Sequence, residues 1–438
     1  MTKQTKSTFV LTDPTEILQA LVGLKDVRVL HYRRDVREVE LMIEQVVVDA
    51  RCPRCGTRAE LKARPVVKYV DLPVFGTPMQ LAWKKHRMRC PKPDCQTKSW
   101  VLRDHRIAAV NCLLTTRAAK WATVQVGEGR TVSEVAGELA CDWHTVNDAV
   151  TTYGQALLKA DRKRLSKTAA IGLDETSFTR FGLGSHAEYA TTVADVQNHQ
   201  IIDILPSREY TEVARWIHRQ PQLWKQRIDT GVLDMSNSYA MVFSATLPKA
   251  TQVVDPFHLV ALANRCLDSV RRRVQMQQAG HRGRREDPLY RARRILLRAE
   301  ETLDAQSTER LKSLLALGDP DAEVAIAYRV KERVRDFYRA GDPDEARELL
   351  TELMDHCVKR AMPPEIRRLG RTIGEWFEKI INYHLTKISN GPTEALNNLI
   401  KRIKRIGFGF RNFQNYRIRA LLYAGKPNWR VLGSIVVR

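Results

Sequence analysis

Three acidic residues, widely separated in the chain, have the types and settings of metal ligands. Asp174 lies in the segment GLDETSF and Asp234 lies in GVLDMS, and both segments are apolar enough to be strands. A carboxylate inside such a strand is costly to bury unless it is paired or binds a cation. Glu394 follows 160 residues after Asp234, at a predicted helix start. Such a set can hold two Mg²⁺ (or Mn²⁺) ions about 4 Å apart, the arrangement that promotes in-line attack on a phosphodiester.

Other interpretations of these acids remain open. Each aspartate alone could end a strand in solvent, and Glu394 beside Pro392 also suits the first turn of a helix. Asp255 and His258 follow the next predicted strand. They either support the metal site through hydrogen bonds or belong to a helix cap. Three further acids compete for the role of metal ligand, namely Glu175, Asp203 and Asp229.

Four of the eight cysteines form two close pairs with the spacing of a zinc centre. The pairs have the patterns C-x2-C and C-x4-C, and their members are Cys52, Cys55, Cys90 and Cys95. Two tight turns that each offer two thiolates can close a tetrahedral Zn²⁺ site, which is structural because no coordination position stays open. The alternatives are four unrelated buried cysteines, or a site in which His86 or His105 replaces one thiolate.

Residues 131–150 have the spacing of a DNA-binding helix-turn-helix. Thr131 or Ser133 can cap the first helix, and the turn falls at Ala140, where such turns usually carry glycine. The residues of the second helix that are expected to face DNA are His144, Thr145, Asn147 and Asp148. An ordinary helical hairpin is the alternative.

Positive charge characterises the whole protein and gathers near its C-terminus. The formal net charge is +22 and the pI is about 9.8, which favours nucleic acid as the partner. The segment after Glu394 could bind phosphates or be a solvated face; its basic residues are Lys401, Arg402, Lys404, Arg405 and Arg411. Residues expected to add hydrogen bonds and stacking surfaces are Asn397, Asn398, Phe408, Phe410 and Tyr416. We expect no membrane segment and no signal peptide, because no suitable apolar run is present.

The elements that must position these residues follow an α/β order. From residue 169, three strand-like segments and a helix precede a strand, a helix and a further strand, with turns expected at 182–185 and 197–198. Residues 260–385 are predicted to be helical, with breaks at 318–321, 341–344 and 363–364 that proline and glycine mark, and residues 107–165 are predicted to be helical as well. The chain is therefore predicted to be a multidomain α/β protein.

Taken together, the motifs resemble those of the DDE transposases of bacterial insertion sequences, in particular the ISL3 family. The shared features run over nearly the whole chain: CPRCG, the helix-turn-helix, GLDETSF, VLDMSNSY, VDPFHLV and SNGPTEALNNLIKRIKRIGFGFRN. The resemblance implies a ribonuclease-H-like core whose acidic triad falls on Asp174, Asp234 and Glu394. It also implies an α-helical insertion between the second aspartate and the glutamate.

These patterns divide the chain into five expected segments. They are a zinc-binding module at 1–105, a helix-turn-helix domain at 106–165, the first part of the catalytic core at 166–260, the α-helical insertion at 261–388, and the end of the core with its basic helix at 389–438.

The expected function is that of a transposase that binds the ends of its insertion sequence and catalyses metal-dependent DNA cleavage and strand transfer. Its partners would be terminal inverted repeats and target DNA, with a homodimer or higher oligomer on the DNA. Its location would be the bacterial cytoplasm, in association with the nucleoid. The alternatives are a non-catalytic DNA-binding regulator derived from a transposase and a ribonuclease-H-like nuclease that never joins DNA.

Overall fold

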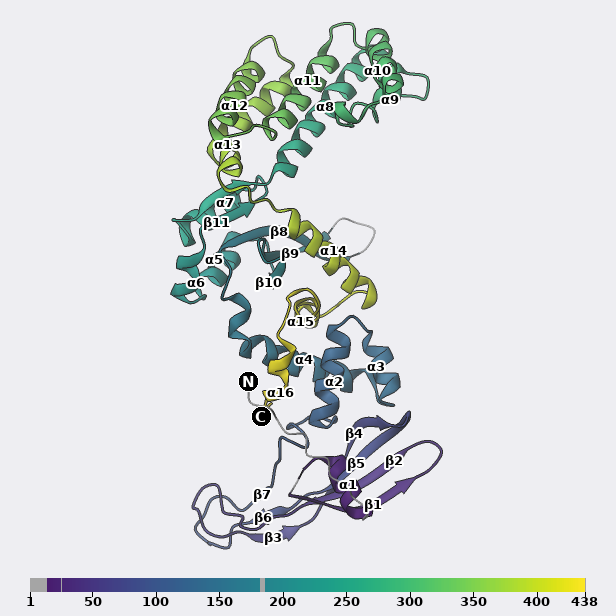
Figure 1. The fold of residues 1–438 in the computed structure, drawn as a ribbon, viewed down its shortest axis with the longest axis vertical. Helices are drawn as coiled ribbons and strands as arrows, with labels where there is room; N and C mark the ends of the chain where they lie inside the picture. Colours follow the sequence, from purple (N-terminus) through teal and green to yellow (C-terminus); the bar gives the residue numbers. More distant parts are fainter. Residues whose placement is uncertain (1–13, 25, 182–185, 438) are drawn as a thin grey trace, which may run out of the picture. The chain divides into compact units, whose positions relative to one another are not determined.

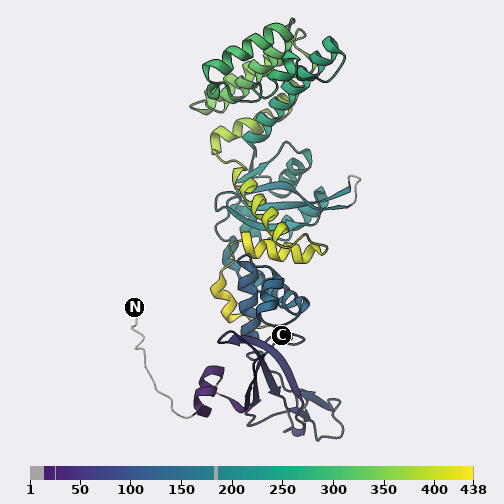
Figure 2. The ribbon, with the colours of Figure 1, turned by 90° about the vertical axis from the view of Figure 1, so that its right-hand side faces the viewer.

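Two compact units make up the chain. The computed structural model describes residues 14–24, 26–181 and 186–437 (Figure 1, Figure 2), so the turn expected at 182–185 lies outside the described residues. The first unit comprises Met1–Arg164 and Arg402–Arg438, and the second comprises Leu165–Lys401. No helix in the described part of the chain is both long and apolar enough to cross a membrane.

The first unit begins with helix α1 (Pro14–Val22) and two antiparallel-rich sheets. The larger sheet has the order β1-β2-β5-β4, with β2 and β5 parallel, and its strands are β1 (Val27–Arg34), β2 (Val39–Gln45), β4 (Val66–Val74) and β5 (Thr77–Lys84). Alternate residues of β2 and β5, such as Leu41, Leu81 and Trp83, form its apolar core. The smaller sheet carries the cysteine turns, and its strands are β3 (Glu60–Ala63), β6 (Arg87–Arg89) and β7 (Ser99–Val101).

Helices complete the first unit. They are α2 (Thr116–Gly127), α3 (Val132–Glu138), α4 (Trp143–Ala160), α15 (Phe413–Ala424) and α16 (Trp429–Ser434), and a short 3-10 helix, η1 (Arg162–Leu165), follows α4. Their shared core joins apolar residues from both ends of the chain, because Ile418, Leu422, Leu432 and Ile435 pack with the residues of α2 to α4.

This packing crosses the expected boundary at residue 389. Residues 402–438 form one compact unit with the N-terminal part of the chain. The physical reason is visible at Gly154 of α4, where a methyl group would stand 2.9 Å from the side chains of both Ile418 and Leu422. The glycine lets α15 approach α4 closely, so the last helices are held by the N-terminal part of the chain.

A five-stranded sheet forms the centre of the second unit. Its order is β10-β9-β8-β11-β12, and its strands are β8 (Ala170–Phe181), β9 (His186–Asp195), β10 (Gln200–Leu205), β11 (Thr230–Leu233) and β12 (Thr251–Val254). The first three strands are antiparallel, whereas β8, β11 and β12 are parallel. Three helices follow or separate these strands, namely α5 (Tyr210–His218), α6 (Gln222–Arg227) and α7 (Asn237–Thr246). The expected α/β order is confirmed, with α6 as an additional helix.

The predicted helical region between β12 and α14 is confirmed, with helix boundaries at the predicted breaks near 318–321, 341–344 and 363–364 and further breaks between α8 and α10. It contains α8 (Pro256–Ala279), α9 (Pro288–Ala292), the short 3-10 helix η2 (Glu300–Thr302), α10 (Ala305–Gly318), α11 (Glu323–Phe337), α12 (Pro343–Val358) and α13 (Pro364–Thr386). Helix α14 (Gly391–Ile406) follows and begins within the second unit.

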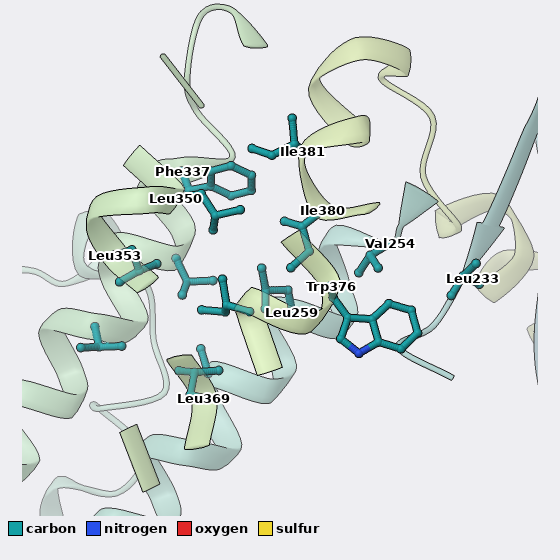
Figure 3. Packing of buried hydrophobic residues seen from close by; sticks show 14 of the residues in the cluster. Leu233, Val254, Leu259, Phe337, Leu350, Leu353, Leu369, Trp376, Ile380 and Ile381 are labelled. Atoms are coloured by element: carbon teal, nitrogen blue, oxygen red, sulfur yellow. The ribbon is translucent and has the colours of Figure 1, made fainter. Parts of the chain in front are cut away.

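One apolar core joins the sheet of the second unit to the helical insertion. Leu233 of β11 and Val254 of β12 belong to the same buried cluster as Leu259 of α8 and Trp376 of α13, and these residues lie together in Figure 3. Because α8 leaves the sheet and α13 returns to it, this shared core fixes the base of the insertion beside the strand ends.

Candidate active site

The sheet brings the two predicted aspartates to corresponding positions of neighbouring parallel strands. Asp234 follows the last residue of β11, whereas Asp174 lies within β8, which continues to Phe181. Leu173 of β8 pairs with Leu233 of the parallel strand β11, and Asp174 and Asp234 are the next residues in each strand's direction. The carboxyl ends of parallel neighbours meet at the same edge of a sheet, where α/β proteins commonly bind ligands. Glu394 lies in the first turn of α14.

The charges of Asp234 and Glu394 both act on Asp174. The pKa of Asp174 is raised to about 6, chiefly by burial; the backbone N–H of Glu175 and the charge of His258 oppose this increase, and the negative charges of Asp234 and Glu394 contribute to it. Burial also raises the pKa of Asp234, against a lowering influence of His258. A group of carboxylates that disfavour one another's charge is stabilised by a bound cation.

Asp255 and His258 lie in the same cluster. The ligand atoms of Asp255, His258 and Glu394 are all within 4.8 Å of one another. Asp255 occupies the position before α8, but its side chain makes no cap hydrogen bond; its Oδ1 instead accepts the backbone N–H of Asn390 at 3.0 Å. The Asp255 side chain thus links the end of β12 to the start of α14.

The surroundings of two carboxylate oxygens indicate whether this cluster suits a metal ion. Asp234 Oδ1 and Asp255 Oδ2 are buried and have no hydrogen-bond partner among the described residues. A buried carboxylate oxygen without a donor is costly unless a cation satisfies it. Hard cations such as Mg²⁺ prefer carboxylate oxygens, so the donors present fit a divalent ion of this kind.

Asn397 holds the first aspartate in place. Its Nδ2 donates to Asp174 Oδ2 at 2.6 Å, and its Oδ1 accepts hydrogen bonds from the hydroxyls of Thr176 and Thr192 at 3.1 and 3.2 Å. Asn397 is buried, so it is no DNA-facing residue of the basic segment. The sequence contains one indication of this role: Asn397 lies three residues after Glu394, so both side chains are on one face of α14.

Gly172 sets the approach of α14 to the central strand. A methyl group at this position would stand 2.3 Å from Asn390 Oδ1 and 2.8 Å from Thr393 Oγ1. Both of those side chains are fully buried at the start of the helix. Only glycine permits this contact without displacement, and the first turn that carries Glu394 depends on it.

The rival acids have other partners. Asp203 Oδ2 accepts the indole N–H of Trp216 at 2.7 Å, and Asp229 Oδ1 accepts the hydroxyl of Thr230 at 2.8 Å. Glu175 pairs with Arg208 at 3.1 Å, although its charge also contributes to the raised pKa of Asp234. These contacts account for Asp203 and Asp229 without any metal.

The four paired cysteines gather at one point of the first unit. Their ligand atoms lie within 4.8 Å of one another, with Sγ separations of 3.7 Å for Cys52 and Cys95 and 3.5 Å for Cys55 and Cys90. Sulfurs about 2.3 Å from a tetrahedral zinc ion are separated by about 3.8 Å, so this spacing fits Zn²⁺. His86 is hydrogen-bonded to Glu44 at 2.9 Å. The grouping therefore needs no histidine in place of a thiolate.

The two helices of the predicted helix-turn-helix are α3 and α4. Thr131 and Glu134 form a capping box at the start of α3, and Asp142 caps α4. Ala140 has a φ of +51°. This left-handed conformation explains why glycine is usual in such turns.

One residue of α4 that was predicted to face DNA is buried in the structure. Asn147 is 6% exposed, because it lies on the same helical stripe as the buried Val150. His144 and Asp148 are exposed, and the Thr145 hydroxyl donates to Asp142 at 2.6 Å as part of the cap. Of the expected set, His144 and Asp148 remain available at the surface.

The basic segment is largely at the surface. The exposed members are Lys401, Arg402, Arg405 and Arg411, and Lys404 is half-buried. Tyr416 is fully buried and packs its ring against Phe410 at 5.6 Å, so the expectation of a stacking surface at Tyr416 is wrong. Phe408 is 96% exposed, and Asn398 is exposed as well.

The second unit is thus a mixed α/β structure with a carboxylate-rich candidate metal centre beside its parallel strands β8, β11 and β12. The chain belongs to the ISL3 family of DDE transposases: the model of that family, described as a transposase, matches residues 171–420. The match begins in β8 and includes Asp174, Asp234 and Glu394.

Two curated relatives are similar over most of their lengths. The transposase for insertion sequence element IS1001 of Bordetella parapertussis is 28% identical over 385 residues, covering 84% of this chain and 88% of the relative. The transposase for insertion sequence element IS1557 of Mycobacterium tuberculosis is 25% identical over 398 residues, covering 85% of each chain. Both similarities extend beyond the catalytic unit, which supports a shared transposase organisation.

Proposed function

We propose that the protein binds the ends of its own insertion sequence and catalyses metal-dependent DNA cleavage and strand transfer. The observation that supports this proposal is that Asp174 and Asp234 directly follow a paired position of the parallel strands β8 and β11, with the charge of Glu394 acting on Asp174, in a chain of the DDE transposase family. The sheet order β10-β9-β8-β11-β12, with three antiparallel and three parallel members sharing β8, supports a ribonuclease-H-like core.

The metal-binding roles in this proposal fall on the acids of the cluster. Asp174, Asp234 and Glu394 would hold two Mg²⁺ or Mn²⁺ ions, with Asp255 and His258 as supporting residues. When bound, such ions activate a water or 3′-hydroxyl and stabilise the leaving oxygen of a phosphodiester. Asn397 and the backbone N–H of Glu175 together fix the orientation of the Asp174 carboxylate, since they donate to its Oδ2 and Oδ1.

The DNA-binding roles fall on the first unit and on the basic segment. A structural Zn²⁺ held by the four cysteines would stabilise the small sheet, and α3 and α4 would act as a helix-turn-helix. The exposed His144 suits contact with a base edge or phosphate, whereas the flexible cations from Lys401 to Arg411 suit phosphates of any sequence. We further propose a homodimer or higher oligomer on DNA, because two ends must be joined in one reaction, and association with the bacterial nucleoid.

A strand-transfer assay tests the proposed function. Purified full-length protein is incubated with Mg²⁺, labelled duplexes that contain the terminal inverted repeats, and target DNA. We expect cleavage at the repeat ends and covalent joining to the target, and neither product without a divalent ion. Nicked products without joining would support a nuclease instead, and specific binding without any cleavage would support a regulator.

A further inference from the structure

The helical insertion carries a cluster of arginines that the candidate active site does not use. Residues 281–298, called the arginine segment here, contain seven arginines and only two acids. The segment begins just after Gly280, where α8 ends in a left-handed turn, and it includes α9. Such a local excess of one charge requires an explanation, because like charges destabilise a compact structure.

Most of these arginines take no part in holding the fold. Arg293 lies over the ring of Tyr290 at 3.7 Å, and Arg298 donates to the carbonyl of Thr302. The other five are exposed and form no ion pair within the described part of the chain. They are Arg282, Arg284, Arg285, Arg291 and Arg294.

Nearby acids do not neutralise this charge. Asp287 is occupied by the backbone N–H of Arg284 and lies 3.5 Å from His281. Glu301, which follows the segment, pairs with Arg335 and Arg339 of α11 and the turn after it. Glu286 is exposed and has no ion pair among the described residues. The arginine segment therefore keeps a net positive charge at the surface.

The segment is held in a defined shape. Gly283 has a φ of +117°, and a methyl group at this position would stand 2.7 Å from the ring of Tyr290. The loop therefore packs directly on α9, while Arg293 covers the ring and donates to the Tyr290 carbonyl at 2.6 Å. A packed loop limits the ordering cost that a ligand must meet when it binds the surrounding guanidinium groups.

The insertion is polarised, with acids gathered on α12. Figure 1 shows α9 and α12 on opposite sides of the insertion. The acids of α12 are Asp344, Glu345, Glu348, Glu352 and Asp355. Because the acids of α12 repel a polyanion and the arginine segment attracts it, a polyanionic partner should approach the insertion from the side of the arginine segment.

We propose that the arginine segment is a second DNA-binding surface, which contacts the phosphate backbone of a duplex without reading its sequence. This inference rests on the proposed function and extends it to the insertion. Guanidinium groups bind phosphates through two parallel hydrogen bonds, and five of them on one loop and helix match a repeating phosphate backbone. Pairing with the acidic α12 of another copy is the alternative; such a head-to-tail contact would produce rings or filaments, which a measurement of self-association detects.

Binding measurements with the full-length protein test this inference. The variant R282Q/R284Q/R285Q removes three charges outside the candidate active site. We expect weaker binding of both end-containing and random duplexes, and a shallower dependence of log K on log salt concentration. The slope should fall by up to about 2.7 if each arginine contacts one phosphate. The variant R282K/R284K/R285K should retain most of the salt dependence, because charge is kept.

A matched control removes three exposed cations elsewhere in the insertion. The variant R333Q/K359Q/R360Q changes the net charge by the same amount but leaves the arginine segment intact. Equal losses in both triple variants would overturn the inference in favour of a general effect of net charge, and unchanged DNA binding in R282Q/R284Q/R285Q would also overturn it.

Two further readouts separate the possible failures. Sedimentation of the same variants detects self-association, and loss of association with unchanged DNA binding would assign the segment to a protein interface. Circular dichroism and thermal unfolding check the fold, and the single variants R282Q and R285Q replace the triple variant if it does not fold. If the wild-type protein itself fails to bind or join DNA, the proposed function is wrong. If the wild-type protein binds and joins DNA but R282Q/R284Q/R285Q binds DNA as tightly as the wild type, only the inference about the arginine segment is wrong.

Discussion

At the scale of single residues, the acids of the candidate site have separable roles. Asp174→Asn, Asp234→Asn and Glu394→Gln preserve side-chain size but remove the negative charge that a divalent ion requires. We expect each change to abolish cleavage and joining, while binding to repeat-containing DNA persists. Gel-based cleavage assays and binding titrations measure the two properties. Near-normal activity of Asp234→Asn would move the second ligand to Asp255, whose Oδ2 is buried without a partner.

Asn397 is expected to act by positioning Asp174. Asn397→Ala removes the donor to Asp174 Oδ2, and loss of such an outer contact typically weakens metal binding by about 10- to 100-fold. The cleavage rate should therefore require more Mg²⁺ for half-saturation, with partial recovery at high Mg²⁺. The exposed neighbour Asn398 offers the matched control, since Asn398→Ala should leave the Mg²⁺ requirement unchanged. A loss of rate that Mg²⁺ cannot restore would contradict the positioning role.

At the scale of elements, the contact between β8 and α14 is set by one glycine. Gly172→Ala would force Asn390 and Thr393 away from the strand and cost about 1–3 kcal/mol of unfolding free energy. Because the same turn carries Glu394, we expect cleavage to fall more than thermal stability alone explains. Gly137→Ala, in α3 with open space around it, should instead stabilise the protein by up to about 1 kcal/mol. Thermal unfolding and cleavage rates of both variants make the comparison, and equal behaviour would reject this role of Gly172.

The small sheet of the first unit should depend on zinc. Metal analysis of the purified protein should give about one zinc per chain, because the four thiols form a single closed site. Cys52→Ser should release the metal and unfold the cysteine turns, whereas Cys266→Ser, far from these turns in sequence, should keep it. A folded and active wild-type protein without zinc would contradict the assignment.

Sequence patterns located elements well where the evidence was local. Alternating apolar residues identified the strands that carry Asp174 and Asp234, and proline and glycine marked the ends of α10 to α12. The role of Asn397 depends on a contact across 223 positions, which no local pattern reports. Asn147 was predicted to face DNA but is buried, because a polar residue type alone does not reveal whether its side of the helix is buried or exposed. The packing of the last helices against α2 to α4 was not predicted, because an apolar helix face does not identify its partner.

At the scale of the whole molecule, the first unit is built from both ends of the chain. Truncation after Lys401 would remove Ile418, Leu422, Leu432 and Ile435 from the core of α2 to α4. Each lost large side chain typically costs about 2–5 kcal/mol, so we expect these helices to lose cooperative unfolding. Specific DNA binding should fail, while the five-stranded sheet, which contains none of the removed residues, stays folded. Hydrogen exchange resolved along the sequence measures both parts; normal protection of α4 in the truncated chain would contradict the expectation.

The return of the C-terminal helices to the N-terminal part also governs when the protein becomes competent. During translation, α2 to α4 emerge early but lack part of their core until the final residues, including α15 and α16, have left the ribosome. The five-stranded sheet and its insertion precede these helices in the chain. A nascent chain would therefore carry its acidic cluster before the core of α2 to α4 is complete. On the proposed function, the order of synthesis would delay DNA recognition until α15 and α16 have joined that core.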